Sequence, residues 1–356
     1  MKLAYLVHLN MDANTGVFKK IYQQIHTWIK LGHDAELFVI TRKLSVAQAV
    51  NQLISGSHVF MYKTMIERLQ TMNEAIRAIL RFSPDATYFR RDMYYPPIAK
   101  LARALPLVLE INSDEGAELW QYNKVQWLYH ILTRPLLDKN VSGMIFVTNE
   151  LSCKGYYGRL NLPKETVANG IILSDFPQLP ISPVSKPNLL FIGVPAFWHG
   201  IDKIVYLAQK FPEWTFHMIG ISKTDIINPP SNMVLYGSLN YQDYLDIAIQ
   251  CHVGIGTLAL HRNGMNEASP LKVREYLAMG LPVIIGYKDT DFSGNEPFLL
   301  YLPNTENNVR DNLSAIEKFV YKWMDKRVER FQIKHLDYNE KERKRLDFID
   351  KVRSGK

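Results

Sequence analysis

The sequence has very little cysteine and no long hydrophobic run. Cys153 and Cys251 are its two cysteines in 356 residues; this excludes a disulfide framework or a cysteine metal site and suits a reducing compartment. No stretch reaches the roughly 18 apolar residues that a membrane-spanning helix needs. The first apolar run, LAYLV, is too short for a signal-peptide core and is expected to be a strand. We therefore expect a soluble, cytoplasmic protein.

Signatures of two other protein classes are also missing. There is no aromatic-basic ribonucleoprotein signature and no zinc-finger spacing, so we expect no nucleic acid as a partner. The first strand is followed by HLNMDANTG rather than by a G-x-G-x-x-G turn. That difference disfavours a nicotinamide-dependent dehydrogenase.

The net charge of +7 is uneven along the chain. Residues 1–172 hold 20 Lys and Arg against 14 Asp and Glu, whereas the remaining residues are nearly balanced. A basic first half could attract a phosphorylated substrate or an anionic membrane, which would place the protein at the inner face of the membrane. A basic surface that only faces solvent explains the same count equally well.

Short apolar runs alternate with segments of helical period in both halves of the chain. Near-continuous apolar strands between helices predict parallel sheets covered on both faces. We therefore expect an α/β protein with two Rossmann-like, doubly wound domains, which bind ligands beyond the carboxyl ends of the strands. The expected strands are 3–7, 36–40, 87–89, 106–111, 144–148, 189–193, 215–220, 233–237, 253–256 and 281–286, and helical spacing covers 17–28 and 65–79.

The domain boundary is expected just before a proline-rich segment. FPQLPISPVSKP has four prolines and is typical of an extended connector. The expected parts are an N-terminal domain at 1–168, a C-terminal domain at 169–318 and a helical tail at 319–356. The tail is highly charged, so its helices are expected on the surface, where they could pack back toward the N-terminal domain.

The segment NEASPLKVREYLAMGLPVIIG carries the clearest helix signals in the chain. Ser269 is a good N-cap and Pro270 suits the first helical position, while Gly280 and the proline after it end the helix. The prediction is a helix at 270–279 that packs on the sheet through Val273 and Leu277.

The start of this helix is a candidate anion site. The N–H groups of Leu271 and Lys272 lack partners within the helix, and the helix dipole favours negative charge there. Lys272 would strengthen such a site, and Glu275 could accept hydrogen bonds from a diol such as ribose. A surface pair of Lys272 and Glu275, worth a few tenths of a kcal/mol, is the plainer alternative.

This segment and several others resemble those of a known family. Glu267-x7-Glu275 followed by YLAMGLPVI resembles the donor-site signature of retaining glycosyltransferases of GT-B fold, especially family 4. VANGI resembles the hinge after the N-terminal domain, and LLFIGVPAFWHGIDKI resembles the first strand and phosphate loop of the C-terminal domain. The resemblance spans most of the chain and implies two domains that face each other across a cleft.

The resemblance implies a role for each site residue. Glu275 would bind the donor ribose, Glu267 would contact the transferred sugar, and the turn from Ser269 through Pro270 and Leu271 to Lys272 would bind the diphosphate. Gly16 and Gly193 would let backbone approach the phosphates. Neither a cofactor nor an essential metal is expected, because cations and helix dipoles stabilise the leaving nucleoside diphosphate in such enzymes.

The chain departs from the family pattern at two habitual cations. Val194 follows Gly193, and His199 precedes Gly200, where the family usually has Arg and Lys. We infer that Lys272, with Arg262, takes over that role and that His199 bonds either a phosphate or the sugar.

The first half offers further candidates at expected strand ends. Asn112 and Asp114 follow one strand and either face a sugar or cap the loop. His8 and Asn10 either line the cleft or cap the end of their strand. The basic-aromatic segment of Arg90, Arg91, Asp92, Tyr94 and Tyr95 either holds an acceptor sugar or a lipid phosphate or is an ordinary surface loop.

The predicted function is transfer of a sugar from a nucleoside-diphosphate sugar to a glycan or lipid-linked acceptor. Two alternatives remain open. A nucleotide-sugar epimerase can share the fold, and a non-catalytic binder of nucleotide sugars or glycans would explain the missing cations.

Overall fold

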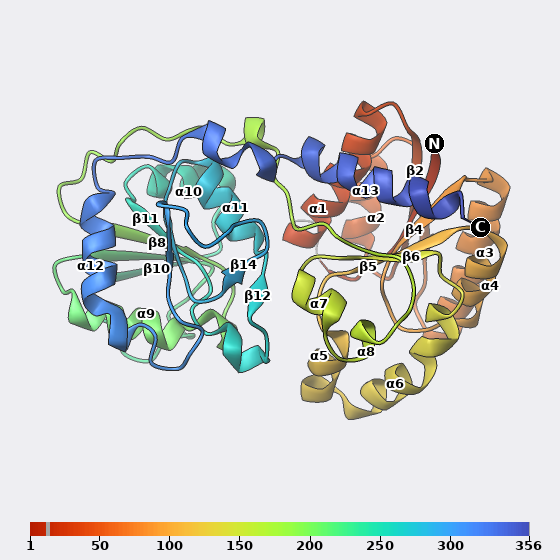
Figure 1. The fold of residues 1–356 in the computed structure, drawn as a ribbon, viewed down its shortest axis with the longest axis horizontal. Coiled ribbons are helices and arrows are strands. Elements are labelled where there is room, and N and C mark those ends of the chain that lie inside the picture. The colour runs from red at the N-terminus through yellow and green to blue at the C-terminus, as the bar shows by residue number, and fades with distance from the viewer. Residues whose placement is uncertain (12–14, 356) are drawn as a thin grey trace. The chain divides into compact units, whose positions relative to one another are not determined.

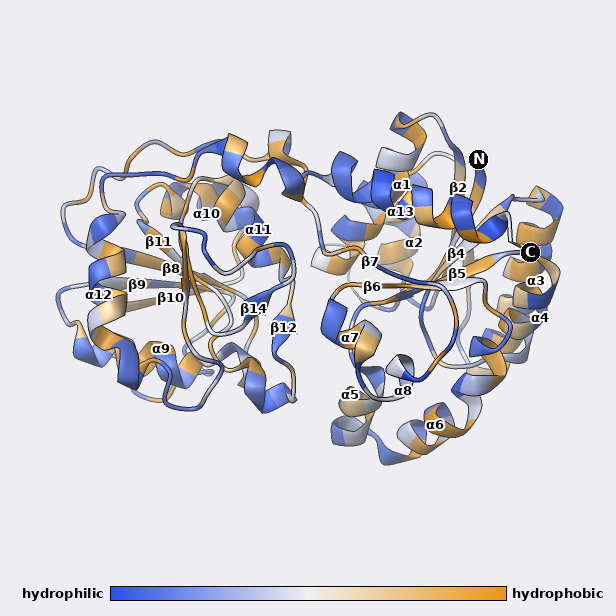
Figure 2. Cartoon of the chain, viewed as in Figure 1, coloured by the Kyte–Doolittle hydropathy of each residue, from blue (hydrophilic) through white to orange (hydrophobic). Residues whose placement is uncertain are grey.

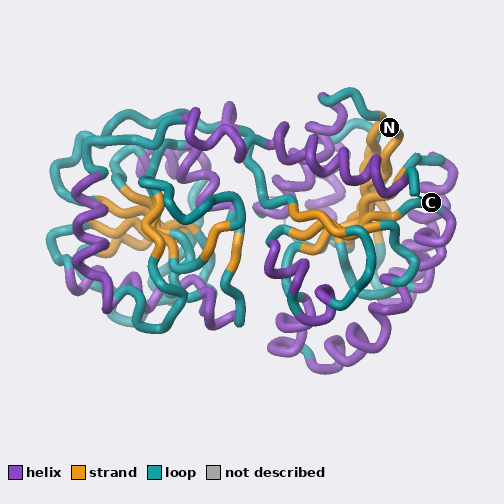
Figure 3. Tube along the Cα trace, viewed as in Figure 1, coloured by secondary structure: helices purple, strands orange, loops and turns teal. Residues whose placement is uncertain are grey.

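The computed structural model describes residues 1–11 and 15–355. They divide into two compact units, of which the first joins the residues up to Ala168 to those from Tyr338 onward. The second unit runs from Asn169 to Asp337. Residues 319–337 of the expected tail therefore belong to the second unit, and the rest belong to the first. In both units the strands form a layer between helices (Figure 3).

Among the described residues, the first unit has a seven-stranded parallel sheet in the order β3-β2-β1-β4-β5-β6-β7. The strands are β1 (Lys2–His8), β2 (Asp34–Thr41), β3 (Ser57–Met61), β4 (Ala86–Arg90), β5 (Leu107–Ile111), β6 (Gly143–Phe146) and β7 (Lys164–Thr166). The helices are α1 (Gly16–Lys30), α2 (Leu44–Leu53), α3 (Met65–Phe82), α4 (Pro96–Ala104), α5 (Glu115–Tyr122), α6 (Lys124–Asp138), α7 (Asn149–Cys153), α8 (Gly155–Gly158) and α13 (Tyr338–Arg353).

The second unit repeats this architecture, with a six-stranded parallel sheet in the order β10-β9-β8-β11-β13-β15 within the described chain. The strands are β8 (Asn188–Ile192), β9 (Thr215–Ile219), β10 (Met233–Gly237), β11 (Val253–Ile255), β13 (Val283–Ile285) and β15 (Leu299–Tyr301), and β12 (Glu267–Ala268) pairs separately with β14 (Lys288–Asp289). The helices are α9 (Ile201–Lys210), α10 (Tyr241–Ala248), α11 (Leu271–Ala278) and α12 (Leu313–Lys322).

The two doubly wound parallel sheets confirm the predicted fold class. The interior strands of both large sheets are mainly hydrophobic, and the helices carry polar residues on their outer sides (Figure 2). The prediction missed β3, β7 and β15, which lie at edges of the two large sheets, and the two-residue strands β12 and β14. Edge strands are short and partly exposed, so they lack the continuous apolar run that reveals an interior strand.

The last helix, α13, was expected on the surface but has a buried face. Leu346, Phe348, Ile349 and Val352 belong to the same hydrophobic core as Tyr5 of β1. In Figure 1, α13 lies beside α1, and the two helices are in contact. The high charge of the segment hid this apolar stripe from the sequence analysis.

Buried polar groups attach α13 to the sheet. Glu342 is fully buried and accepts hydrogen bonds from Nε1 of Trp28 (2.7 Å) and from Nε of Arg345 (2.9 Å). Arg345 also donates to the hydroxyl of Tyr88 in β4 (2.5 Å). Burial raises the pKa of Glu342, while the Arg345 guanidinium opposes that rise. Removing one partner of a buried pair leaves the other charge uncompensated.

We predict that Arg345→Met destabilises the first unit by about 3–5 kcal/mol, because Glu342 then loses its cation inside the core. Lys344→Met is the matched control on the same helix, since Lys344 is exposed and its ion pair with Glu165 is worth about 1 kcal/mol or less. Hydrogen exchange of the β1 and β4 amides measures the difference. Equal protection in the two variants would contradict the prediction.

Candidate functional site

The candidate site of the second unit lies at the switch point of its sheet. From β8 the chain runs to β9 and β10 on one side, then returns to place β11 on the other side. A parallel sheet wound this way leaves a crevice at the carboxyl ends of the two central strands. The segments that follow β8 and β11 meet there: Leu258 and Ala259 donate backbone hydrogen bonds to the carbonyls of His199 and Trp198.

Helix α11 packs against this end of the sheet. Val273 and Leu277 are fully buried, as predicted. Tyr276 lies against Gly254 of β11, where an added Cβ would approach its ring to 2.5 Å. The Tyr276 hydroxyl accepts a hydrogen bond from the backbone N–H of Ile192 (2.7 Å), the last residue of β8. The helix therefore begins beside the loop that follows β8.

The start of α11 differs from the prediction by one residue and in its capping. Pro270 occupies the N-cap position with extended backbone and makes no side-chain cap bond. Ser269 is not a cap: its hydroxyl accepts hydrogen bonds from the N–H of Asn169 (2.9 Å) and from Arg274 (2.8 Å). Leu271 and Lys272 are the first helical residues, so their N–H groups lack partners within the helix.

Arg274 fixes this arrangement, although the sequence analysis did not single it out. Its guanidinium is fully buried and bonds Asp289 through two nitrogens (2.6 and 2.8 Å) and Asp291 (2.8 Å). Its Nε donates to the carbonyl of Asn169 (3.1 Å). Asp289 and Asp291 form an Asp-x-Asp pair, a spacing that can bind metal, but Arg274 occupies both carboxylates in this structure.

Lys272 contrasts with Arg274, because its ammonium is buried without a hydrogen-bond partner among the described residues. Nζ lies 4.1 Å from the centre of the Phe191 ring, a contact that compensates only part of the lost hydration. Burial lowers the pKa of Lys272 to about 7, although Glu275 acts in the opposite direction. The site thus holds a desolvated cation that an anionic ligand would stabilise.

The loop after β8 brings Gly193 and His199 beside this lysine. Gly193 has φ +152°, and a Cβ there would lie 2.9 Å from Nζ of Lys272 and 3.2 Å from Cε1 of His199. Nδ1 of His199 lies 2.9 Å from the carbonyl oxygen of Val194. Burial, followed by the nearby Lys272 ammonium, lowers the pKa of His199 to about 4. At neutral pH this imidazole is uncharged.

In the sequence, the two glutamates of the signature come before and after the start of α11. Glu267 is buried in β12, opposite Lys288 of β14. Glu275 is half-buried on α11, and its charge acts on Lys272 and on Tyr241 and Tyr244 of α10. The helix start and Lys272 come between them in the sequence.

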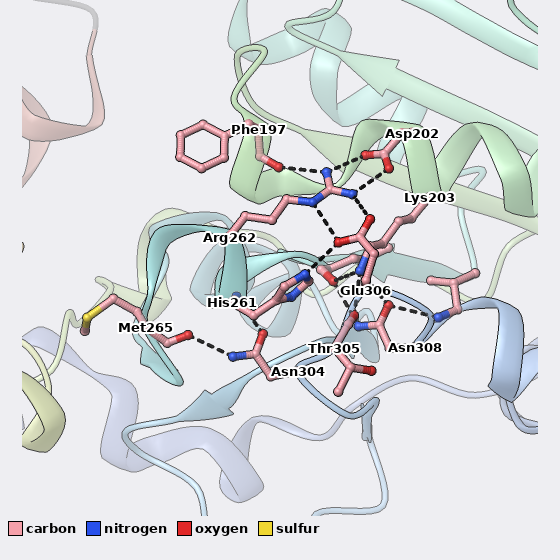
Figure 4. A network of polar contacts seen from close by, with 12 residues as sticks. Phe197, Asp202, Lys203, His261, Arg262, Met265, Asn304, Thr305, Glu306 and Asn308 are labelled. Carbon is pink, nitrogen blue, oxygen red and sulfur yellow. Dashed lines mark hydrogen bonds and ion pairs between the residues drawn. The ribbon is translucent and has the colours of Figure 1, made fainter. Parts of the chain in front are cut away.

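Arg262, predicted as a phosphate ligand, is already engaged (Figure 4). It lies in the short helix η3 (Leu260–Asn263), and its guanidinium bonds Asp202 (2.7 and 2.8 Å), Glu306 and the carbonyl of Phe197. Nearby, the buried Lys203 donates to the carbonyls of Leu258 and Thr305 and to Asn308. In this structure Arg262 therefore holds loops together.

A cavity of about 310 Å³ adjoins the phosphate-loop segment, and all its lining residues belong to the second unit. Its walls are mainly apolar, with two carboxylates. The lining residues are Pro195, Ala196, Phe197, Ile201, Asp202, Ile221 and Asp225.

In the first unit, a polar cluster lies at the corresponding switch point between β1 and β4. His8 at the end of β1 is 2.8 Å from Asp92, which follows β4, and Arg68 of α3 is 2.5 Å from the same carboxylate. Nε2 of His8 lies 2.7 Å from the hydroxyl of Tyr62 and 2.8 Å from the amide of Asn10. The sequence indicates His8, Asn10 and Asp92 as candidates, whereas Tyr62 and Arg68 lie far from them along the chain and carry no local signal.

Asn112 and Asp114 have identifiable partners in the first unit. Oδ1 of Asn112 accepts a hydrogen bond from Lys20 of α1 (2.6 Å), which also pairs with Glu110 (2.8 Å). Asp114 caps α5 by accepting from the N–H of Ala117 (3.1 Å), which is the capping alternative. Gly16 is the first residue of α1, and residues 12–14 of the predicted glycine loop lie outside the described chain.

A second cavity, also of about 310 Å³, lies between the segment after β4 and helices α5 and α6. Nε2 of His130 and Nε of Arg91 are buried there without a hydrogen-bond partner among the described residues. Burial raises the pKa of Glu115 to about 7, against the attraction of Arg91. The lining residues are Arg91, Asp92, Met93, Glu115, Glu118, Leu119, Tyr122, Gln126 and His130.

Comparison with known proteins gives matches in structure alone. No protein-family model matches the chain. No curated protein matches its sequence. A glycosyltransferase from Rickettsia africae is 12% identical with a TM-score of 0.71, covering 99% of this chain and 98% of that one. Anabaena HepE (Alr3699), in complex with UDP and glucose, is 11% identical with a TM-score of 0.70, covering 98% and 99%.

An α-glucosyltransferase in complex with UDP and DNA is similar as well, at 11% identity with a TM-score of 0.66, covering 98% of this chain and all of that one. These likenesses show the fold: the chain has the GT-B architecture of glycosyltransferase structures. The last complex contains DNA, whereas the sequence of this chain predicts no nucleic-acid partner.

We predict that Lys272→Met stabilises the protein in the absence of ligand. The unfolded lysine titrates near 10.4 and the folded one near 7, so the unfolded state binds more protons between these values. The free-energy cost of burying the ammonium in the folded state is largest below about pH 7 and decreases as the pH rises toward 10. At pH 7 we expect a gain of about 1 kcal/mol or more, hence a Tm higher by about 2–4 °C, which shrinks by pH 9.

Thermal unfolding of the wild type, Lys272→Met and Lys318→Met at both pH values measures this effect. Lys318 is exposed on α12, so its replacement controls for the loss of a surface charge. A lower Tm for Lys272→Met at pH 7 would show that the ammonium is stabilised within the structure.

Proposed function

We propose that this chain is a retaining glycosyltransferase of the family 4 type. It transfers a sugar from a nucleoside-diphosphate sugar to a glycan or lipid-linked acceptor. The observation that carries the proposal is the buried Lys272 ammonium at the start of α11, which has no hydrogen-bond partner among the described residues. The GT-B architecture and the spacing of Glu267 and Glu275 support it.

In this proposal the donor diphosphate binds at the start of α11. Lys272 and the N–H groups of the first turn neutralise the charge that develops as the bond between sugar and phosphate breaks. A side chain at Gly193 would crowd Nζ, because its Cβ would lie 2.9 Å from that atom, so the glycine keeps the approach to Nζ open. Gly16 stays a predicted phosphate-loop residue. Arg262 holds loops and is not assigned to the phosphate.

The remaining contacts to the nucleotide sugar follow from hydrogen-bonding chemistry. Nδ1 of His199 faces a carbonyl and must donate, so the neutral ring offers Nε2 only as an acceptor. A sugar hydroxyl suits that atom and a phosphate does not, so we favour the sugar as the partner of His199. Glu275 binds the ribose, Glu267 binds the transferred sugar, and the cavity of the second unit binds the base.

The acceptor is assigned to the cavity of the first unit. The unpaired buried nitrogens of His130 and Arg91 and the carboxyl group of Glu115 can form hydrogen bonds with the hydroxyl groups of an acceptor. In the reaction the acceptor oxygen attacks the anomeric carbon from the face of the leaving diphosphate, and the acceptor proton passes to a phosphate oxygen. This step needs no protein nucleophile. Asn112 and Asp114 remain predicted sugar contacts, with Asn112 positioned by Lys20.

A panel of UDP and GDP sugars tests the function. We predict that the wild type hydrolyses or transfers at least one donor, and that Glu267→Gln or Glu267→Ala lowers kcat by about 100-fold while changing donor affinity only a few-fold. Glu317→Ala, at an exposed position on α12, is the control.

Each alternative function gives a different result in the same assay. Epimerised donor without free nucleotide would identify an epimerase. Calorimetric binding without turnover of any donor would identify a non-catalytic binder and overturn the proposal.

We also predict that donor binding weakens as the pH rises. The ammonium of Lys272 must be charged to bind the diphosphate, so above about pH 7 each pH unit weakens binding by up to tenfold. The phosphates of a nucleotide sugar are diesters and do not titrate in this range. Lys272→Arg keeps its charge and should show a flat profile. Calorimetry at pH 6 to 9 tests this prediction, and a flat wild-type profile would contradict it.

A further inference from the structure

The outer face of α6 is apolar, which is unusual for a helix on the surface of a unit. Val125 and Leu132 are 81% and 67% exposed, and Leu128, Tyr129 and Leu136 are exposed as well. These five residues, which we call the α6 face, follow the spacing i, i+3, i+4, i+7 and i+11 and therefore form one stripe. The opposite side of the same helix is buried through His130 and Leu137. A helix that buries one side normally presents polar residues on the other.

Exposed aromatic residues also lie next to the N-terminal end of α6, on α5, which is in contact with α6. Trp120 and Tyr122 of α5 are both exposed. The ammonium of Lys124 lies 4.8 Å from the centre of the Trp120 ring, and Trp120 packs edge-on against Trp127. Amphipathic aromatic rings beside lysine are typical of a surface at a lipid–water boundary.

The charges around the α6 face have one sign. From Pro96 to Asn140, a stretch that the structure describes completely, the exposed charged residues are all basic: Lys100, Arg103, Lys124 and Lys139. The acidic residues of the same stretch are buried or half-buried, and Asp138 pairs with Arg91. Each Lys or Arg close to an anionic bilayer contributes about 1 kcal/mol of attraction.

We propose that the α6 face, with Trp120 and Tyr122, docks the protein onto an anionic phospholipid membrane. The charge pattern selects this occupant over a second copy of the chain, because self-association through the face would bring like charges together. The helix has 15 residues and would lie flat in the interface over about 22 Å. None of the helices in residues 1–11 and 15–355 is long and apolar enough to cross a bilayer. The proposal does not depend on the glycosyltransferase activity.

Co-sedimentation of the full chain with lipid vesicles tests the docking. The vesicles contain phosphatidylcholine alone or with about one third phosphatidylglycerol. We expect binding to the mixed vesicles, at least tenfold weaker binding to the neutral ones, and weakening in high salt because the attraction is screened. Val125→Glu/Leu132→Glu should lower binding to the mixed vesicles at least tenfold. Replacing Lys100, Lys124 and Lys139 by Glu should do the same.

Leu44→Glu/Leu53→Glu is the matched control, because these α2 residues belong to the same unit and are also exposed. It should bind vesicles as the wild type does. Donor hydrolysis by Val125→Glu/Leu132→Glu should stay unchanged, which separates this test from that of the proposed function. Absence of wild-type binding, or equal loss in the control, would overturn the proposal. So would a wild-type dimer that Val125→Glu/Leu132→Glu dissociates in light scattering.

Discussion

The buried guanidinium of Arg274 is the interaction on which the candidate donor site depends. It joins α11 to the two carboxylates after β13, to Ser269 before the helix and to the carbonyl of Asn169, where the chain enters the second unit. A buried charge is stable only when its hydrogen-bonding positions are filled, and those of Arg274 are filled from three separate segments. The start of α11 is therefore held by contacts from outside the helix. Its first N–H groups need no side-chain cap and stay available to a ligand.

Lys272 lies only two residues from Arg274, but its environment is the opposite. Arg274 is neutralised by two aspartates, whereas the Lys272 ammonium has lost its water without gaining a hydrogen-bond partner among the described residues. Such a desolvated cation destabilises the folded protein, and perturbed groups of this kind are concentrated at functional sites. Val194 and the neutral ring of His199 add no positive charge beside Lys272. A further charge beside Nζ would lower the pKa of Lys272 even more.

The sequence was sufficient to predict the two doubly wound sheets, their interior strands and the position of α11, because these depend on local hydrophobic pattern and turn residues. It was not sufficient where the partner lies far along the chain. Ser269 has the properties of an N-cap, but it instead bonds Asn169, 100 residues earlier. Arg68 meets His8 and Asp92 only through the order of the strands. The charged C-terminal segment hid the apolar face of α13, and nothing local showed that this face completes the first core.

Tyr122 belongs to both features proposed for the first unit. It lines the proposed acceptor cavity together with Gln126, and its side chain is also exposed near the N-terminal end of α6. If the hydroxyl groups of a ligand fill the cavity, the part of the ligand that extends out of the cavity therefore lies beside an apolar surface. A free oligosaccharide has nothing to place on that surface, whereas a lipid-linked acceptor carries a polar head and an apolar chain in this order. The geometry within the first unit thus favours the lipid-linked member of the two acceptor classes, and a docked membrane would present that acceptor at the mouth of the cavity.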